Sequence, residues 1–93
     1  MSFNQESAVL RAKEDLAGRL KIKDADVHDG SVTEKDFPDS SLGTPVGDEM
    51  AAQMISSGWQ IILKADGKSF EYRADKYQLR LHNFNGRNYV IVQ

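Results

Sequence analysis

Apolar and polar side chains alternate along the last third of the chain, from residue 59 to residue 92. A period of two is typical of strands that bury one face of a sheet. The dipeptides at 66–67 (Asp-Gly) and 85–86 (Asn-Gly) interrupt this pattern, and both are typical of two-residue hairpin turns because these residues accept positive φ. With a further reversal at 75–76, the pattern predicts an antiparallel meander of four strands.

These turns also predict which residues lie opposite one another. The six expected pairs are Leu63 with Phe70, Ile61 with Tyr72, Tyr72 with Leu79, Phe70 with Leu81, Leu81 with Val90, and Leu79 with Val92. All three hairpins then place their apolar residues, together with Trp59, on one face, and a one-residue slip would turn them outward. On the polar face we expect Glu71 beside Arg80 and His82 beside Tyr89.

Residues 7–20 predict an amphipathic helix. Apolar side chains recur there at three- and four-residue spacing, at Val9, Ala12, Leu16 and Leu20, with Leu10 and Ala17 widening the stripe. Ser7 is a suitable N-cap residue. Because the stripe consists mainly of Leu, Val and Ala, it favours packing on the apolar face of the sheet.

The segment between the helix and the meander gives weaker signals. Residues 21–36 are polar and ambiguous, and we interpret 31–37 as a strand with a break or bulge at Gly30 that ends at Pro38. Residues 38–48 form a long loop, whereas 49–56 fit a short helix or a strand equally well. The whole pattern predicts one α+β domain over residues 1–93: an N-terminal amphipathic helix packed on an antiparallel β-meander of four to five strands.

Charge and composition narrow the functional classes. The 93 residues carry a net charge of -2, with basic and acidic side chains interspersed, which argues against nucleic-acid binding. The chain has no cysteine, and no apolar run is long enough to insert in a membrane. Its first residues lack the layout of a signal peptide. The chain as written is therefore expected to be cytoplasmic, or exported if a signal sequence has been removed.

No residues form a pattern expected of a metal or catalytic site. The aspartates within 24–29 resemble a calcium loop, but its sixth position is Asp29 instead of Gly and its twelfth is Lys35 instead of Glu. His28 and His82 are far apart in the sequence and lack a third ligand. We therefore expect no catalytic residue, no metal and no cofactor.

The loop at 38–48 is the best candidate for a contact surface, because long loops in small domains are often functional. Its serines have no nearby base that would make either a nucleophile. The residues proposed to contact a partner are Phe37, Asp39, Ser40, Ser41 and Leu42. In this interpretation Leu42 anchors the loop.

The sequence thus favours a non-catalytic binding or interaction module that contacts a protein partner the sequence does not identify. The main alternative is a small enzyme or ligand-binding subunit whose site is completed by homodimerisation. A third is a structural accessory domain. The oligomeric state stays open.

Three runs of residues resemble a group of short bacterial domains, often cyanobacterial and often exported or lipid-anchored. They are Phe37–Pro45, Ala52–Ile55 and Gly58–Leu63. The pattern of that group is an aromatic-Pro-Asp-Ser-Ser-Leu-Gly-Cys-Pro run, followed by Ala-Gln-hydrophobic-Ile and an alternating strand, and the similarity covers about residues 8–75. The resemblance implies no activity. Thr44 stands where the group has Cys and Ser57 where it has Pro, which weakens any inference of export or disulfide linkage.

Overall fold

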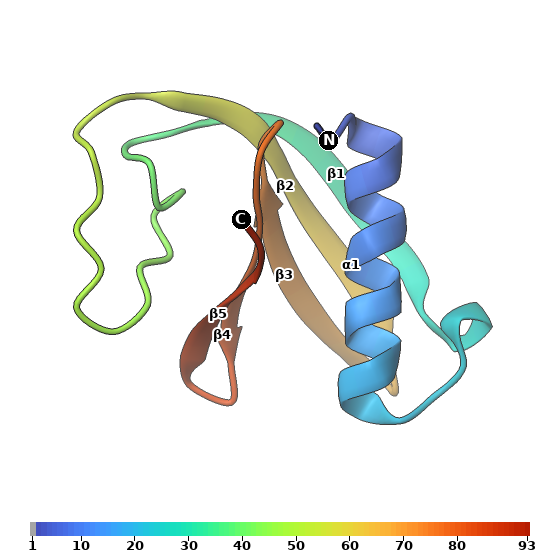
Figure 1. Cartoon of the computed structure of the whole chain (residues 1–93). Helices are drawn as coiled ribbons and strands as arrows, with labels where there is room; N and C mark the ends of the chain where they lie inside the picture. Colours follow the sequence, from blue (N-terminus) through green and yellow to red (C-terminus); the bar gives the residue numbers. More distant parts are fainter. Residues whose placement is uncertain (1) are drawn as a thin grey trace.

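The computed structural model describes residues 2–93, which fold as one helix on a five-stranded antiparallel sheet (Figure 1). The elements are α1 (Gln5–Leu20), a 3-10 turn (Asp24–Asp26), β1 (His28–Phe37), β2 (Ser56–Ala65), β3 (Lys68–Ala74), β4 (Leu79–Phe84) and β5 (Arg87–Val92). The strands lie side by side in sequence order, β1 to β5. The predicted α+β class is confirmed.

Helix α1 begins two residues earlier than predicted, and its N-cap is Asn4. The Asn4 side chain accepts a hydrogen bond from the backbone N–H of Ser7 at 2.8 Å, and the Ser7 hydroxyl accepts one from the backbone N–H of Asn4 at 2.9 Å. The two residues form a capping box, so Ser7 lies inside the helix. The buried helix residues are Ala8, Ala12, Leu16 and Ala17, whereas Leu10 is exposed.

The core lies between α1 and the sheet. It includes Ile61 and Leu63 of β2, which pair with Tyr72 and Phe70 of β3, so the predicted register of this hairpin is confirmed. The Tyr72 hydroxyl donates a hydrogen bond of 2.7 Å to Asp15 of α1. Burial, and then this contact with a carboxylate, raise the pKa of Tyr72 above its ordinary value.

The predicted register between β3 and β4 is wrong by two residues. Tyr72 pairs with Leu81 instead of Leu79, because the strands are joined by four residues, 75–78, and not by a two-residue turn. The Asp75 carboxylate holds this connection by accepting the backbone N–H groups of the third and fourth residues. A shift of two residues keeps every side chain on its predicted face.

This shift changes two polar neighbours on the other face. Glu71 pairs with His82, and Arg80 pairs with Arg73. The predicted contact between Glu71 and Arg80 is therefore wrong, and the counter-charge of Arg80 comes from elsewhere.

The pairing of β4 with β5 is partly as predicted. Leu79 pairs with Val92, but Leu81 pairs with Tyr89 instead of Val90 because the ladder is irregular around Asn83, whose φ is 53°. Tyr89 consequently packs on the helix side, and it does not lie beside His82.

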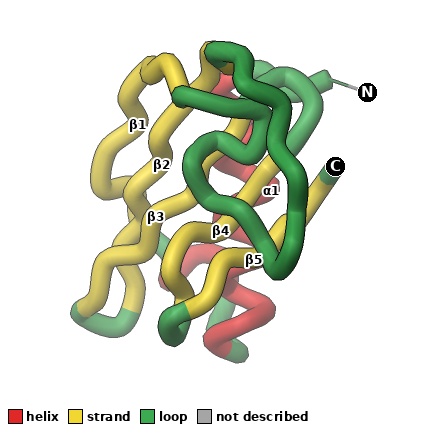
Figure 2. The backbone as a smooth tube through the Cα atoms, turned by 90° about the vertical axis from the view of Figure 1, so that its left-hand side faces the viewer, coloured by secondary structure: helices red, strands yellow, loops and turns green. Residues whose placement is uncertain are grey.

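Strand β1 begins at His28, three residues earlier than predicted, and lies at an edge of the sheet. Its register shift at Gly30 and its end before Pro38 are as predicted. Residues 38–55, which we call the β1–β2 loop, contain neither helix nor strand. Both structures considered for 49–56 are therefore wrong, except that residue 56 begins β2. The loop lies on the sheet face opposite α1 (Figures 1 and 2).

Candidate functional site

The first part of the β1–β2 loop is folded around one carboxylate. Asp39 Oδ1 accepts hydrogen bonds from the Ser41 hydroxyl at 2.6 Å, the Ser41 N–H at 2.9 Å and the Gly43 N–H at 3.2 Å. These bonds, the Ser41 hydroxyl first, lower the pKa of Asp39. Leu42 adopts a φ of 57°, unusual for a branched side chain, and its side chain is fully buried. The burial of the Leu42 side chain thus stabilises the unusual backbone conformation of this turn.

Two side chains from the sheet and one from the β3–β4 connection hold the loop backbone in place. Each one donates a hydrogen bond to a loop carbonyl: Arg73 to Leu42 at 2.8 Å, Gln78 to Ser40 at 2.7 Å, and Arg80 to Thr44 at 3.1 Å. These carbonyls are thereby satisfied without water. The sheet and the β3–β4 connection therefore set the path of the loop, which has no helix or strand of its own.

An ion pair fixes the far side of the loop. The two terminal guanidinium nitrogens of Arg80 each donate a hydrogen bond of 2.6 Å to a Glu49 carboxylate oxygen, and the Arg80 side chain is only 2% exposed. The hydrogen bonds from Arg80 lower the pKa of Glu49, against the opposing effect of desolvation. A buried charge of this kind needs its partner, so the loop and the sheet depend on each other here.

Arg73 adds a second cation beneath the loop. Its guanidinium carbon lies 5.6 Å from the centre of the Phe37 ring, and its Nε lies 2.6 Å from a Glu71 oxygen. Burial raises the pKa of Glu71, but the hydrogen bonds from Arg73 and Gln60 outweigh it and leave the pKa lowered. Both arginines beneath the loop, Arg73 and Arg80, are therefore paired with carboxylates of this chain.

The five residues predicted to contact a partner are brought together but face different ways. Phe37 and Leu42 have no exposed surface, and Ser41 is 2% exposed. Asp39 and Ser40 are half-buried and keep some surface for contact. The Ser40 hydroxyl accepts the Ala52 N–H at 2.7 Å, which joins the two arms of the loop.

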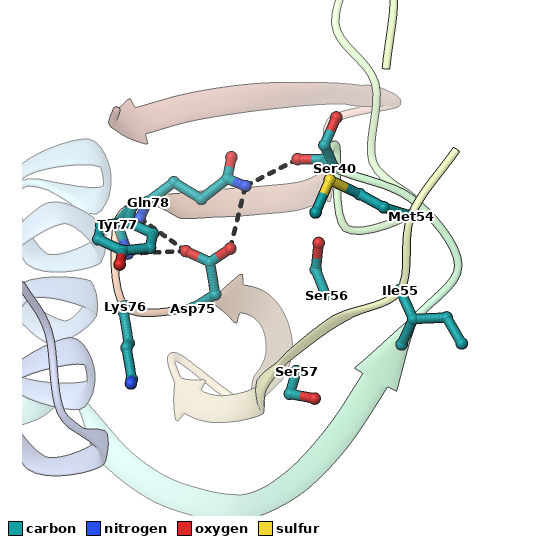
Figure 3. Close-up of a pocket in the computed structure, with 9 residues that line it drawn as sticks. All are labelled: Ser40, Met54, Ile55, Ser56, Ser57, Asp75, Lys76, Tyr77 and Gln78. Atoms are coloured by element: carbon teal, nitrogen blue, oxygen red, sulfur yellow. Dashed lines mark hydrogen bonds between the residues drawn. The ribbon is translucent and has the colours of Figure 1, made fainter. Parts of the chain in front are cut away.

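A groove opens where the end of this loop meets the β3–β4 connection (Figure 3). Its volume is about 360 Å³, and it is lined by Ser40, Met54, Ile55, Ser56, Ser57, Asp75, Lys76, Tyr77 and Gln78. We call it the Tyr77 groove. Met54, Ile55 and Tyr77 are 59%, 72% and 72% exposed, and they are three of the five large apolar residues that the structure leaves exposed between residues 2 and 93.

A second hollow adjoins the Tyr77 groove. Ser57 and Lys76 line both, and the second is also lined by Glu34, Lys35, Asp36, Gly58 and Trp59. The two hollows together follow the end of the sheet from the loop to the edge strand β1. The first hollow combines three apolar residues with Asp75 and Lys76, and the second has more charged residues, including Asp36.

Sequence reasoning missed the apolar residues of this groove. Met54 and Ile55 stand in a segment with no clear period, and Tyr77 stands in a connection that looked like a tight turn. The available signal was the presence of two large apolar residues, Met54 and Ile55, in a segment that fits neither a helix nor a strand period. That Met54 and Ile55 line the same groove as Tyr77 depends on the tertiary structure.

The residues considered for metal binding stay apart. His28 is on β1 and His82 on β4, and His82 Nδ1 lies 3.1 Å from the Asn88 side-chain oxygen. Within residues 2–93 no three His, Cys, Asp or Glu side chains come together in a way that could hold a metal ion. No helix in this part of the chain has the length and apolar character needed to cross a membrane.

Comparison with known proteins places the chain in a family. Residues 9–82 match DUF8738, a domain of unknown function, and the chain belongs to that family. The match covers α1 from residue 9, the β1–β2 loop, strands β1 to β3, and β4 as far as residue 82. Neither the curated proteins nor the solved structures contain a significant match.

Proposed function

We propose that this protein is a non-catalytic binding module that takes an apolar side chain of a partner protein into the Tyr77 groove. The observation that carries the proposal is the gathering of Met54, Ile55 and Tyr77 around one hollow, although they come from two distant segments. Exposed apolar patches with polar surroundings are typical of protein-binding sites. The predicted loop contributes Ser40 to the wall.

The rigidity of the loop supports this proposal. Phe37, Ser41 and Leu42 are buried and shape the loop, so they contribute to binding without touching the partner. The hydrogen bonds from the sheet and from the β3–β4 connection hold the loop in the absence of a partner. A preformed surface loses little conformational entropy on binding, which favours affinity.

Charge suggests which partner segment fits. Lys76 lines both hollows, is exposed, and forms none of the ion pairs found among residues 2–93. The Asp75 carboxylate beside it is occupied by the N–H groups of Tyr77 and Gln78. We therefore infer a partner segment with an apolar side chain for the groove and an acidic side chain next to it.

The family match also supports a narrower assignment. The bacterial group with the aromatic-Pro-Asp-Ser-Ser-Leu-Gly-Cys-Pro run resembles this chain over about residues 8–75, nearly the same segment as the DUF8738 match at 9–82. We propose that the group and the family are the same. A cytoplasmic location stays a prediction of the sequence as written.

Selection from a library of displayed random peptides tests the proposed binding. Peptides enriched on the wild-type protein should share an apolar residue next to Asp or Glu. Ile55→Ser and Tyr77→Ala should each weaken the binding of such a peptide about fivefold or more, since truncated central anchors commonly cost over about 1 kcal/mol. Lys76→Glu should weaken it as well.

Met50→Ser is the matched control. Met50 is 95% exposed but does not line the groove, so its loss should leave peptide binding unchanged. Melting temperatures of all the variants should stay close to that of the wild type, because the side chains are exposed. Peptide binding that survives both Ile55→Ser and Tyr77→Ala would contradict the proposal, and so would a library that yields no enriched peptide.

A further inference from the structure

The two edges of the sheet differ in chemistry. Strand β1 carries charged residues at positions 29 and 34–36 and has a register shift at Gly30. Charges and bulges are the devices by which proteins protect a sheet edge from pairing with another chain. Strand β5 also pairs irregularly with its neighbour β4, but it carries no charge after Arg87 and has four consecutive apolar residues, 89–92.

The outer side of β5 is also free of hydrogen bonds. Figure 2 shows β5 at the end of the row of strands. Among residues 2–93, no backbone group of Arg87–Val92 is bonded to anything but its neighbour β4. The side chains from Asn88 to Val92 are all half-buried, so a moderately apolar surface accompanies this open edge.

We propose that β5 pairs antiparallel with β5 of a second copy of this chain, joining the two sheets into one of ten strands. Such a contact is isologous: the same surface is used twice, related by a two-fold axis. A register centred on Val90 places Tyr89 opposite Ile91 of the other copy, and Ile91 opposite its Tyr89. Aromatic residues paired with β-branched ones stabilise neighbouring strands.

Charge favours a second copy as the occupant of this edge. No charged side chain stands between Asn88 and Gln93, so two copies approach without like charges facing each other. In the register centred on Val90, the one cation of the strand, Arg87, lies opposite Gln93 of the other copy. Pairing over six residues is a small interface, so we expect dissociation in the micromolar range.

Sedimentation velocity of the full chain over a wide concentration range tests this proposal. The wild type should change from monomer to dimer within the micromolar range. Val90→Lys places two ammonium groups face to face at the two-fold axis and should abolish the dimer. Thr33→Lys is the matched control, because it adds the same charge to the other edge and should leave the dimer unchanged.

Gln93→Glu and Gln93→Lys test the register at a position that cannot unfold the protein, since Gln93 is exposed and follows the last strand. The new carboxylate faces Arg87 of the other copy and should tighten the dimer two- to five-fold, whereas the new ammonium should weaken it by a similar factor. A wild type that stays monomeric overturns the proposal. A dimer that ignores both Gln93 changes, or that is lost in Thr33→Lys, overturns it too. The surface is separate from the Tyr77 groove, so the two proposals fail independently.

Discussion

Removing the charge of Glu49 is the most informative test of how the β1–β2 loop is held. Glu49→Gln keeps the size of the side chain but leaves the buried Arg80 guanidinium, 2% exposed, without its counter-charge. Two bonds of 2.6 Å are weakened, and hydrogen bonds to charged groups contribute about 1.5–3 kcal/mol. Since Glu49 itself is 20% exposed, water can reach part of the site. We therefore expect a loss of about 2 kcal/mol in the free energy of unfolding.

Urea denaturation measures this loss. The urea concentration at the midpoint of unfolding should fall, with little change in the dependence of the unfolding free energy on urea concentration. The melting temperature should drop by about 4–8 °C for each kcal/mol lost in a domain of this size. Lys13→Met is the control, because it breaks an ion pair whose partner Asp29 is 64% exposed, and it should cost less than about 1 kcal/mol. The double variant Arg80→Met with Glu49→Gln should cost less than the sum of its parts.

The pH dependence provides a second measurement of the same pair. The pKa of Glu49 in the folded protein lies below its ordinary value of 4.5, so the pair stabilises the fold above that pH and the stabilisation is lost as the pH falls through the lowered pKa. Glu49→Gln should therefore flatten the acid limb of the stability curve. A loss under about 0.5 kcal/mol, with unchanged amide exchange across residues 38–55, would refute this account of the loop.

Three further predictions follow from burial and backbone contacts. Leu16→Ala should cost about 2–5 kcal/mol by urea denaturation, whereas the same change at the exposed Leu10 should cost little, and equal effects would mean that the wrong helix face has been placed in the core. Gly58→Ala should destabilise the fold by about 1–3 kcal/mol, because the new Cβ would lie 2.0 Å from a backbone oxygen of β3. Gly18→Ala is the contrasting change: its new Cβ would have no atom within 4 Å, so it should stabilise the helix by about 0.5–1 kcal/mol. Asp39→Ala should speed amide exchange at the two loop N–H groups that its carboxylate accepts, and unchanged exchange there would show that other contacts hold the turn.

Local chemistry explains the parts of the fold that the sequence predicts well. The Asp66-Gly67 turn has φ values of 53° and 73°, which few other residues adopt cheaply, and a two-residue turn leaves only one register for β2 and β3. The helical stripe identifies Ala12 and Leu16 as core for a similar reason, since spacing alone determines the face of a helix. The capping box formed by Asn4 and Ser7 would also have predicted the correct start of the helix.

The connection between β3 and β4 shows the limit of such reasoning. Asp75 accepts two backbone N–H groups and lengthens the turn to four residues, a choice that the residue types 75–76 do not reveal. The register therefore moved by two residues. The predicted face survived because a strand repeats every two residues, and a shift of two leaves that alternation intact.

Only the tertiary structure decided the role of the outer sheet face. From its place in a strand, Arg80 looked like a solvent-exposed residue, but the β1–β2 loop covers it and supplies Glu49, 31 positions earlier in the chain. The Tyr77 groove has the same origin, because Ile55 and Tyr77 come from segments that have no local reason to meet. Sequence periodicity specifies which face of an element is apolar. It carries no information on which distant segment covers the polar face, since that depends on contacts between residues far apart in the chain.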